Sequence, residues 1–178
     1  MTHPIVVCAT DLSGLLKGVA DVNPTFMSTE DKAAALRGLT RVEAQVAELR
    51  LRVLADAGDL AVASAARDAA GWLAQHTRVR FDTARADLVL AVALDRRYLS
   101  LATALRDGEV NVAQARVIVA ALDALPDTVD ADTLTRAEAH LVAQAADFGP
   151  KELGRLGRHV LQVVAPQVAD EAEARPVG

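Results

Sequence analysis

The longest helical pattern in this chain of 178 residues runs from Ser28 to about Ala57, with no proline inside it. Ser28 and Asp31 resemble a capping box at its start, and Gly58 stops it. At about 1.5 Å per residue such a helix is roughly 40 Å long, so we expect it to span the whole domain. Spacings of four and three residues give it one apolar seam, which we expect to face another helix: Ala35, Leu39, Val42, Val46, Leu49 and Val53.

Composition and spacing indicate helices in the rest of the chain and no sheet. Roughly a fifth of the residues are alanine and only 3% are aromatic, which is typical of long helices and argues against a β-sandwich or barrel. We therefore predict an all-α fold, a multi-helix bundle with one long helix spanning the domain and a central helical hairpin. The further helices are expected over residues 60–75, 82–107 (continuous or bent near residue 96), 112–125, 131–146 and 150–165.

A turn of only a few residues joins the two helices of the expected hairpin. Gly108 is placed to be a left-handed C-cap, and Asn111 with Gln114 supplies the next capping box. Trp72 follows an alanine-rich apolar face, so we expect a rigid core anchor rather than an exposed ring that stacks on bases. The expected structural anchors are Trp72, Leu73, Gly108, Asn111 and Gln114.

Helix signals and charge divide the chain into three parts. We expect a flexible start with a short helix capped by Asp11 over residues 1–27, a helical domain over residues 28–165, and an acidic tail or linker over residues 166–178. The start has no cationic segment, and its apolar run is too short for a signal peptide or a membrane span. We therefore expect a cytoplasmic protein without membrane contact.

The sequence shows no constellation of catalytic or metal-binding residues. A single cysteine, Cys8, excludes an internal disulfide and every multi-cysteine zinc site. No histidine has a second histidine or a carboxylate three or four residues later, the spacing that would put two ligands on one helix face. We therefore expect no metal, no cofactor and no enzymatic activity in this chain; its four histidines are His3, His76, His140 and His159.

Any binding of nucleic acid has to be local, because the net charge is -5 and the isoelectric point is near 5.3. The stretch from residue 76 to residue 116 holds seven arginines and five carboxylates, a surplus of two positive charges. Arg85 and Arg96 are eleven residues apart and so lie nearly on one face of a helix. The candidate phosphate-facing set is Arg78, Arg80, Arg85, Arg96 and Arg97.

Several short stretches resemble one known protein family. They read LTRVEAQ at residues 39–45, AGWLAQHT at residues 70–77, ALRDGEV at residues 104–110 and QARVI at residues 114–118. In this order they resemble the actinobacterial family called domain of unknown function 222, also known as the 13E12 repeat family. The resemblance covers roughly residues 30 to 165.

Members of that family are usually the N-terminal part of longer proteins that end in an HNH nuclease domain. The resemblance therefore implies a non-catalytic helical domain that positions or regulates such a nuclease on DNA. Neither His140 nor His159 sits in an HNH motif, and the zinc-knuckle cysteines of the family are missing, so catalysis by this chain is not expected. The alternative is a helical oligomerisation or protein-interaction module without DNA contact, in which the long-helix seam or the last helix packs on a second copy or a partner chain.

Overall fold

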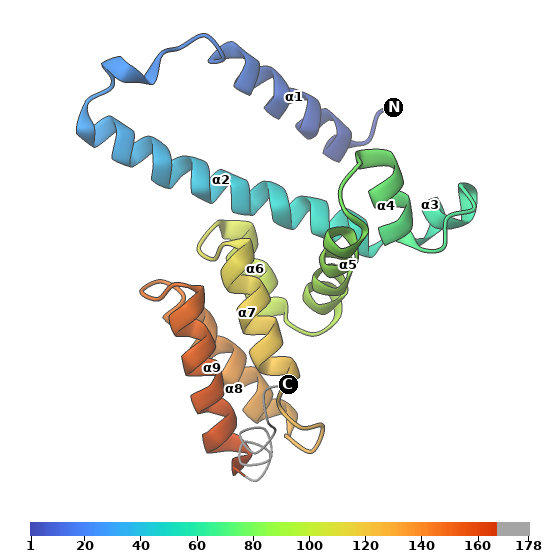
Figure 1. The fold of residues 1–178 in the computed structure, drawn as a ribbon, viewed down its shortest axis with the longest axis vertical. Coiled ribbons are helices and arrows are strands. Elements are labelled where there is room, and N and C mark those ends of the chain that lie inside the picture. Colours follow the sequence, from blue (N-terminus) through green and yellow to red (C-terminus); the bar gives the residue numbers. More distant parts are fainter. Residues whose placement is uncertain (167–178) are drawn as a thin grey trace. The chain divides into compact units, whose positions relative to one another are not determined.

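The computed structural model describes residues 1–166, and helices joined by turns and loops are the only regular secondary structure in this part of the chain (Figure 1). The predicted all-α class is therefore confirmed. The acidic tail or linker expected over residues 166–178 lies outside the described residues except for Pro166. The described backbone forms two compact units, residues 1–38 and residues 39–166.

The first unit holds helix α1 (Pro4–Gly18), a short 3-10 helix (Pro24–Phe26) and the first turns of α2 (Thr29–Ala55). The side chain of His3 caps α1, since its Nδ1 accepts a hydrogen bond of 3.2 Å from the backbone N–H of Ile5. The first ten residues, expected to be flexible, are thus mostly helical, and Asp11 lies inside the helix instead of capping it. The proline at the first helical position explains the early start, because its fixed φ suits the first turn.

Helix α2 begins with the predicted cap and continues into the second unit from Leu39. There it buries a different face from the one expected. Ser28 accepts a hydrogen bond from the backbone N–H of Asp31 at 3.0 Å and donates one to its carboxylate at 2.7 Å. The predicted seam points to solvent, with Val42 and Val46 41% and 43% exposed. The buried face consists of Ala44, Glu48, Leu51 and Leu54.

The expected helix over residues 60–75 is two helices, α3 (Gly58–Ala63) and α4 (Ala69–Thr77). Between them Ala65 has a positive φ of 53°, an uncommon left-handed conformation for a residue with a side chain. Asp68 then caps α4, because its carboxylate accepts a hydrogen bond of 2.8 Å from the N–H of Gly71. The carboxylate cap in mid-segment is the local reason for the break.

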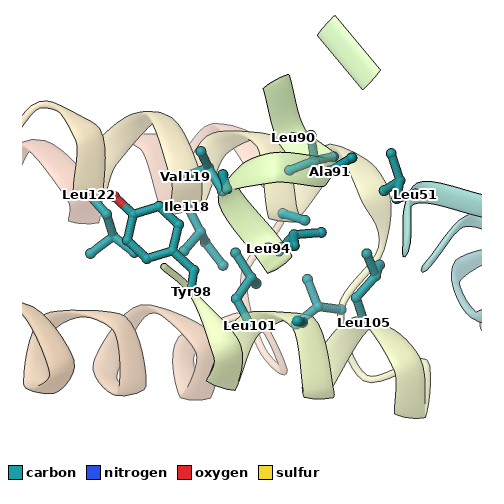
Figure 2. Packing of buried hydrophobic residues seen from close by; sticks show 14 of the residues in the cluster. Leu51, Leu90, Ala91, Leu94, Tyr98, Leu101, Leu105, Ile118, Val119 and Leu122 are labelled. Atoms are coloured by element: carbon teal, nitrogen blue, oxygen red, sulfur yellow. The ribbon is translucent and has the colours of Figure 1, made fainter. Parts of the chain in front are cut away.

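The remaining helices build the core of the second unit. They are α5 (Phe81–Arg96), α6 (Leu99–Asp107), α7 (Val112–Asp123), α8 (Ala131–Gln144) and α9 (Pro150–Val164). Leucines and small residues from α2, α5, α6 and α7 meet in one buried cluster, whose packing Figure 2 shows. Helix α7 lies against α9, and α4 lies against α5 (Figure 1).

Helices α6 and α7 are joined by a four-residue turn. Gly108 has a φ of 71°, and a Cβ added there would lie 2.3 Å from Cγ of Arg41, so the turn requires glycine. Asn111 and Gln114 cap each other through hydrogen bonds of 2.9 and 3.0 Å. The side-chain nitrogen Nε2 of Gln114 also donates to the backbone carbonyls of Ala145 and Phe148, at 2.8 and 2.9 Å. One buried glutamine therefore ties the start of α7 to the connection between α8 and α9.

The other two expected anchors lie on α4. Leu73 is buried, and Trp72 is half-buried with its ring packed against the core cluster. The ring of Trp72 also stacks on His76, with 4.4 Å between the ring centroids. Its face is thus occupied by another side chain within its own helix, which leaves less of it open to stacking on bases.

Candidate functional site

The five arginines singled out from the sequence lie along α5 and its two ends, not in one cluster. Arg78 and Arg80 precede the helix, Arg85 lies in its second turn, and Arg96 and Arg97 lie at its end. Arg85 and Arg96 are about 16 Å apart along the axis, at 1.5 Å per residue. All five side chains are exposed.

Three of the five arginines are paired with carboxylates. Arg80 contacts Asp82 at 3.3 Å, and this pair is almost fully exposed. Arg85 contacts Asp68, the N-cap of α4, at 3.2 Å. A phosphate at either position has to compete with a carboxylate for the guanidinium, which weakens these residues as anion ligands.

The third pair belongs to a small polar cluster of Arg97, Tyr98 and Asp123. The two terminal nitrogens of Arg97 donate to the two carboxylate oxygens of Asp123, at 2.7 and 3.3 Å. The hydroxyl of Tyr98 donates to the same carboxylate at 2.5 Å, and the guanidinium carbon lies 4.9 Å from the centre of the tyrosine ring. Burial, with the hydrogen bond to Asp123, raises the pKa of Tyr98 well above its usual value. Arg97 therefore fastens the end of α5 to the end of α7.

Arg78 and Arg96 remain as exposed cations without an ion pair anywhere in residues 1–166. Arg78 is the C-cap of α4 and has a left-handed backbone, with φ of 60°. Arg96 is the last residue of α5. Two separate cations at opposite ends of a helix make a weak anion site by themselves.

Arg106 and Arg116, the other two arginines of residues 76–116, each contact a buried carboxylate. Asp87 on α5 is 4% exposed and is bound by Arg50 of α2 and Arg116 of α7. A buried carboxylate without a cation is strongly unfavourable, so these arginines hold the carboxylate in place. Arg116 is thereby taken out of the set available to phosphate.

Glu48 on α2 forms a second centre of this kind. It is 5% exposed, and its carboxylate is contacted by Arg52 at 3.3 Å and by Arg106 at 3.0 Å. The spacing of Glu48 and Arg52 by four residues is typical of a solvated pair on a helix surface. The structure shows instead a carboxylate that fixes α2 to α6.

A cationic surface that sequence reasoning missed lies on α9. Lys151, Arg155 and Arg158 are spaced by four and three residues and share one exposed face, which we call the basic face. None of them has an ion pair within the described part of the chain. Glu152, the one carboxylate in α9, is half-buried. The basic face therefore carries three positive charges that no described carboxylate neutralises.

Close packing fixes the direction of this face. Leu153 and Gly157 on the opposite side of α9 are buried, and a Cβ added to Gly157 would lie 2.5 Å from Cβ of Ala121 on α7. The glycine lets the two helices approach so closely. The signal for the basic face was present in the sequence, as a helix start at Pro150 followed by cations at helical spacing.

The possible metal ligands of residues 1–166 lie apart from one another. No group of three or more histidine, cysteine, aspartate or glutamate side chains within residues 1–166 is close enough to hold a metal ion. A surface hollow of about 270 Å³ between α2, α5 and α6 has a lining that includes Glu48, Asp95 and Arg106, of which Glu48 and Arg106 already pair with each other. Among the described helices, none combines the length and apolar character that crossing a membrane requires.

Comparison with known protein families identifies a match over most of the chain. Residues 28–177 match the family described as Domain of unknown function (DUF222), the family that the stretches at residues 39–45, 70–77 and 104–110 resemble. No curated protein and no solved structure matches the chain. Because the match covers most of the sequence, the chain belongs to the DUF222 family.

Proposed function

We propose that this chain is a non-catalytic helical domain that binds the DNA backbone and so positions or regulates an HNH nuclease domain of the same protein. The observation that carries the proposal is the basic face of α9, with Lys151, Arg155 and Arg158 exposed and without ion pairs in residues 1–166. Such a face suits phosphate contact without base reading. The proposal places the protein in the cytoplasm, together with DNA.

The geometry of the basic face suits a polyanion better than a single small anion. From Lys151 to Arg158 the cations extend about 10 Å along the helix axis, at 1.5 Å per residue. Duplex DNA carries one negative charge per about 1.7 Å of its axis, so all three cations can lie near different phosphates at once. An arginine can also bind one phosphate through two parallel hydrogen bonds.

The arginines along α5 have unequal parts in this proposal. Arg78 and Arg96 are exposed and unpaired in the described residues, so they can add long-range attraction. Arg80, Arg85 and Arg97 contact DNA only if they leave Asp82, Asp68 and Asp123. We therefore assign the main phosphate contacts to α9.

Fluorescence anisotropy with labelled duplex and single-stranded DNA, at several salt concentrations, tests the proposal. Binding is expected to weaken with salt, and the variant Lys151→Gln/Arg155→Gln/Arg158→Gln is expected to lose most of the affinity. Its slope of log K against log salt should be smaller by about two to three, since each phosphate contact contributes about 0.9. Base sequence should have little effect.

A matched control removes the same charge from other exposed positions. The variant Lys32→Gln/Arg67→Gln/Arg136→Gln has the same net charge as the α9 variant, and all three side chains are exposed. Affinity close to that of the wild type is expected. Equal losses of affinity in the two variants would mean that net charge alone explains the effect, and would reject the basic face as the binding site. Absence of DNA binding at low salt would reject the proposed function.

A further inference from the structure

The exposed side of α2 carries an ordered row of apolar side chains, which we call the outer seam. Leu39, Val42, Val46 and Val53 are 58%, 41%, 43% and 44% exposed, and Leu49 is half-buried. On the helix they lie opposite Ala44, Leu51 and Leu54, which pack into the core of the second unit. The outer seam is thus a second apolar face of a helix whose first face is already occupied.

We propose that the outer seam pairs with the outer seam of a second copy of this chain, as a short antiparallel coiled coil. The spacings from Leu39 to Val53 are three, four, three and four residues, which is the pattern of the two apolar positions of a heptad. A heptad row fits another helix with the same row, since each side chain enters a gap between four side chains of the partner helix. The proposal is independent of DNA binding.

Charge complementarity favours an antiparallel over a parallel arrangement of the two α2 helices. Glu43 and Arg50 are seven residues apart and lie on the same flank of the outer seam. In an antiparallel pair the same flanks of the two helices meet, so Glu43 of each copy faces Arg50 of the other. The central layers then join Val46 to Leu49 and Val42 to Val53 across the interface. A parallel pair brings opposite flanks together and places Gln45 and Gly38 beside these charges, so that it forms no ion pair.

Both charged groups are accessible at the surface for these contacts. Glu43 is exposed and has no ion pair in residues 1–166. Arg50 is half-exposed, and the carboxylate that it contacts, Asp87, is also bound by Arg116. Arg50 can therefore turn toward a second copy without leaving Asp87 unpaired.

The length of the outer seam limits the strength of the pairing. Leu39 to Val53 extends about 21 Å along the helix axis, or four turns. Standard stable interfaces bury about 1,600 Å² in total, and a four-turn helix pair buries less. We therefore expect a weak dimer whose population depends on protein concentration.

Sedimentation equilibrium of the full chain tests the pairing between about 10 µM and about 1 mM, a range that brackets weak association. The dimer is expected at the upper end. The variant Val46→Glu puts two carboxylates at the centre of the interface and is expected to weaken association at least about tenfold, by analogy with the cost of burying unpaired charge. Because Val46 is exposed, the helix content by circular dichroism should stay unchanged.

The control is Val62→Glu, the same change at a valine of α3 that is 85% exposed and lies outside the outer seam. Its dimerisation should match that of the wild type. A monomer at every concentration, or the same loss in both variants, would overturn the proposal.

Disulfide trapping tests the direction. In a Cys8→Ser background, which removes the one native thiol, the variants Val42→Cys and Val53→Cys are oxidised separately and as a mixture. The antiparallel pairing predicts a cross-linked dimer mainly in the mixture, since residue 42 of one copy faces residue 53 of the other. Cross-linking of each variant with itself, and no gain on mixing, would overturn the antiparallel arrangement.

Discussion

Glu48, which is buried, and Arg106, which is half-exposed, form a contact between α2 and α6, although 58 residues separate them. One carboxylate oxygen of Glu48 accepts hydrogen bonds from Nε and Nη2 of Arg106, at 3.3 and 3.0 Å. Arg52 contacts the same carboxylate from α2 itself. Within the second unit, α2 is therefore held to α6 by a polar contact in addition to its leucines.

Removing the two partners should have unequal effects. Arg106→Met leaves a buried carboxylate with one arginine, and we expect a loss of about 1 to 3 kcal/mol of unfolding free energy. Glu48→Met leaves two arginines that are half-exposed and can turn to water, so the loss should be smaller. Urea unfolding followed by circular dichroism measures both, and a larger loss for Glu48→Met would contradict this account.

A comparison of the predicted and observed α2 shows which features of this fold can be predicted from sequence. Its cap at Ser28 was predictable, because a cap depends on residues three positions apart. Its buried face was not, because that face contains Ala44 and Glu48, and the valines of the outer seam gave a stronger pattern. Hydrophobic spacing identifies an amphipathic helix, but it does not say which of two apolar faces the fold uses.

The candidate site was predictable to a smaller extent. The carboxylates that pair with Arg85 and Arg97 lie 17 and 26 residues away in sequence, so neither pair could be seen before the fold was known. The basic face of α9 depends only on helical spacing and could have been found. It lay outside the stretch of residues 76–116 in which arginines were counted.

Gly108 should be among the most sensitive positions of the chain. Its φ of 71° is unfavourable for any other residue, and an added Cβ would lie 2.9 Å from the carbonyl oxygen of Arg41, which cannot easily move. Gly108→Ala is expected to cost about 1 to 3 kcal/mol. Thermal and urea unfolding measure the loss, and a stability equal to that of the wild type would mean that the turn between α6 and α7 can relax.

The two glycines within α9 provide an internally controlled test of its packing on α7. A Cβ at Gly157 would lie 2.5 Å from Cβ of Ala121, whereas one at Gly154 would lie 3.7 Å from its nearest neighbour, Val117. Gly157→Ala should therefore destabilise by about 1 to 3 kcal/mol through overpacking. Gly154→Ala should stabilise by about 0.5 to 1 kcal/mol through helix propensity. Equal effects at both positions in urea unfolding would argue against the close approach of α7 and α9.

Tyr98 is the single tyrosine of the chain. Its ionisation can therefore be followed by the ultraviolet absorbance of tyrosinate, without a contribution from a second tyrosine. Burial and the hydrogen bond to Asp123 raise its pKa in the folded protein. The neutral hydroxyl is thus favoured by the fold. Its contribution to stability should be complete below about pH 10, the pKa of a free tyrosine, and should be lost as the pH rises through the higher folded value.

The measurement is a rapid absorbance titration of the folded protein compared with protein unfolded in urea. Folded Tyr98 should stay neutral at a pH at which the unfolded chain has ionised, and Asp123→Asn should lower the folded pKa, because the carboxylate that favours the neutral hydroxyl is replaced by an amide. Tyr98→Phe serves as the control for the stability measurement and should remove this part of its dependence on alkaline pH. An ordinary tyrosine titration in the folded protein would contradict the contact between Tyr98 and Asp123, and with it the fastening of α5 to the end of α7.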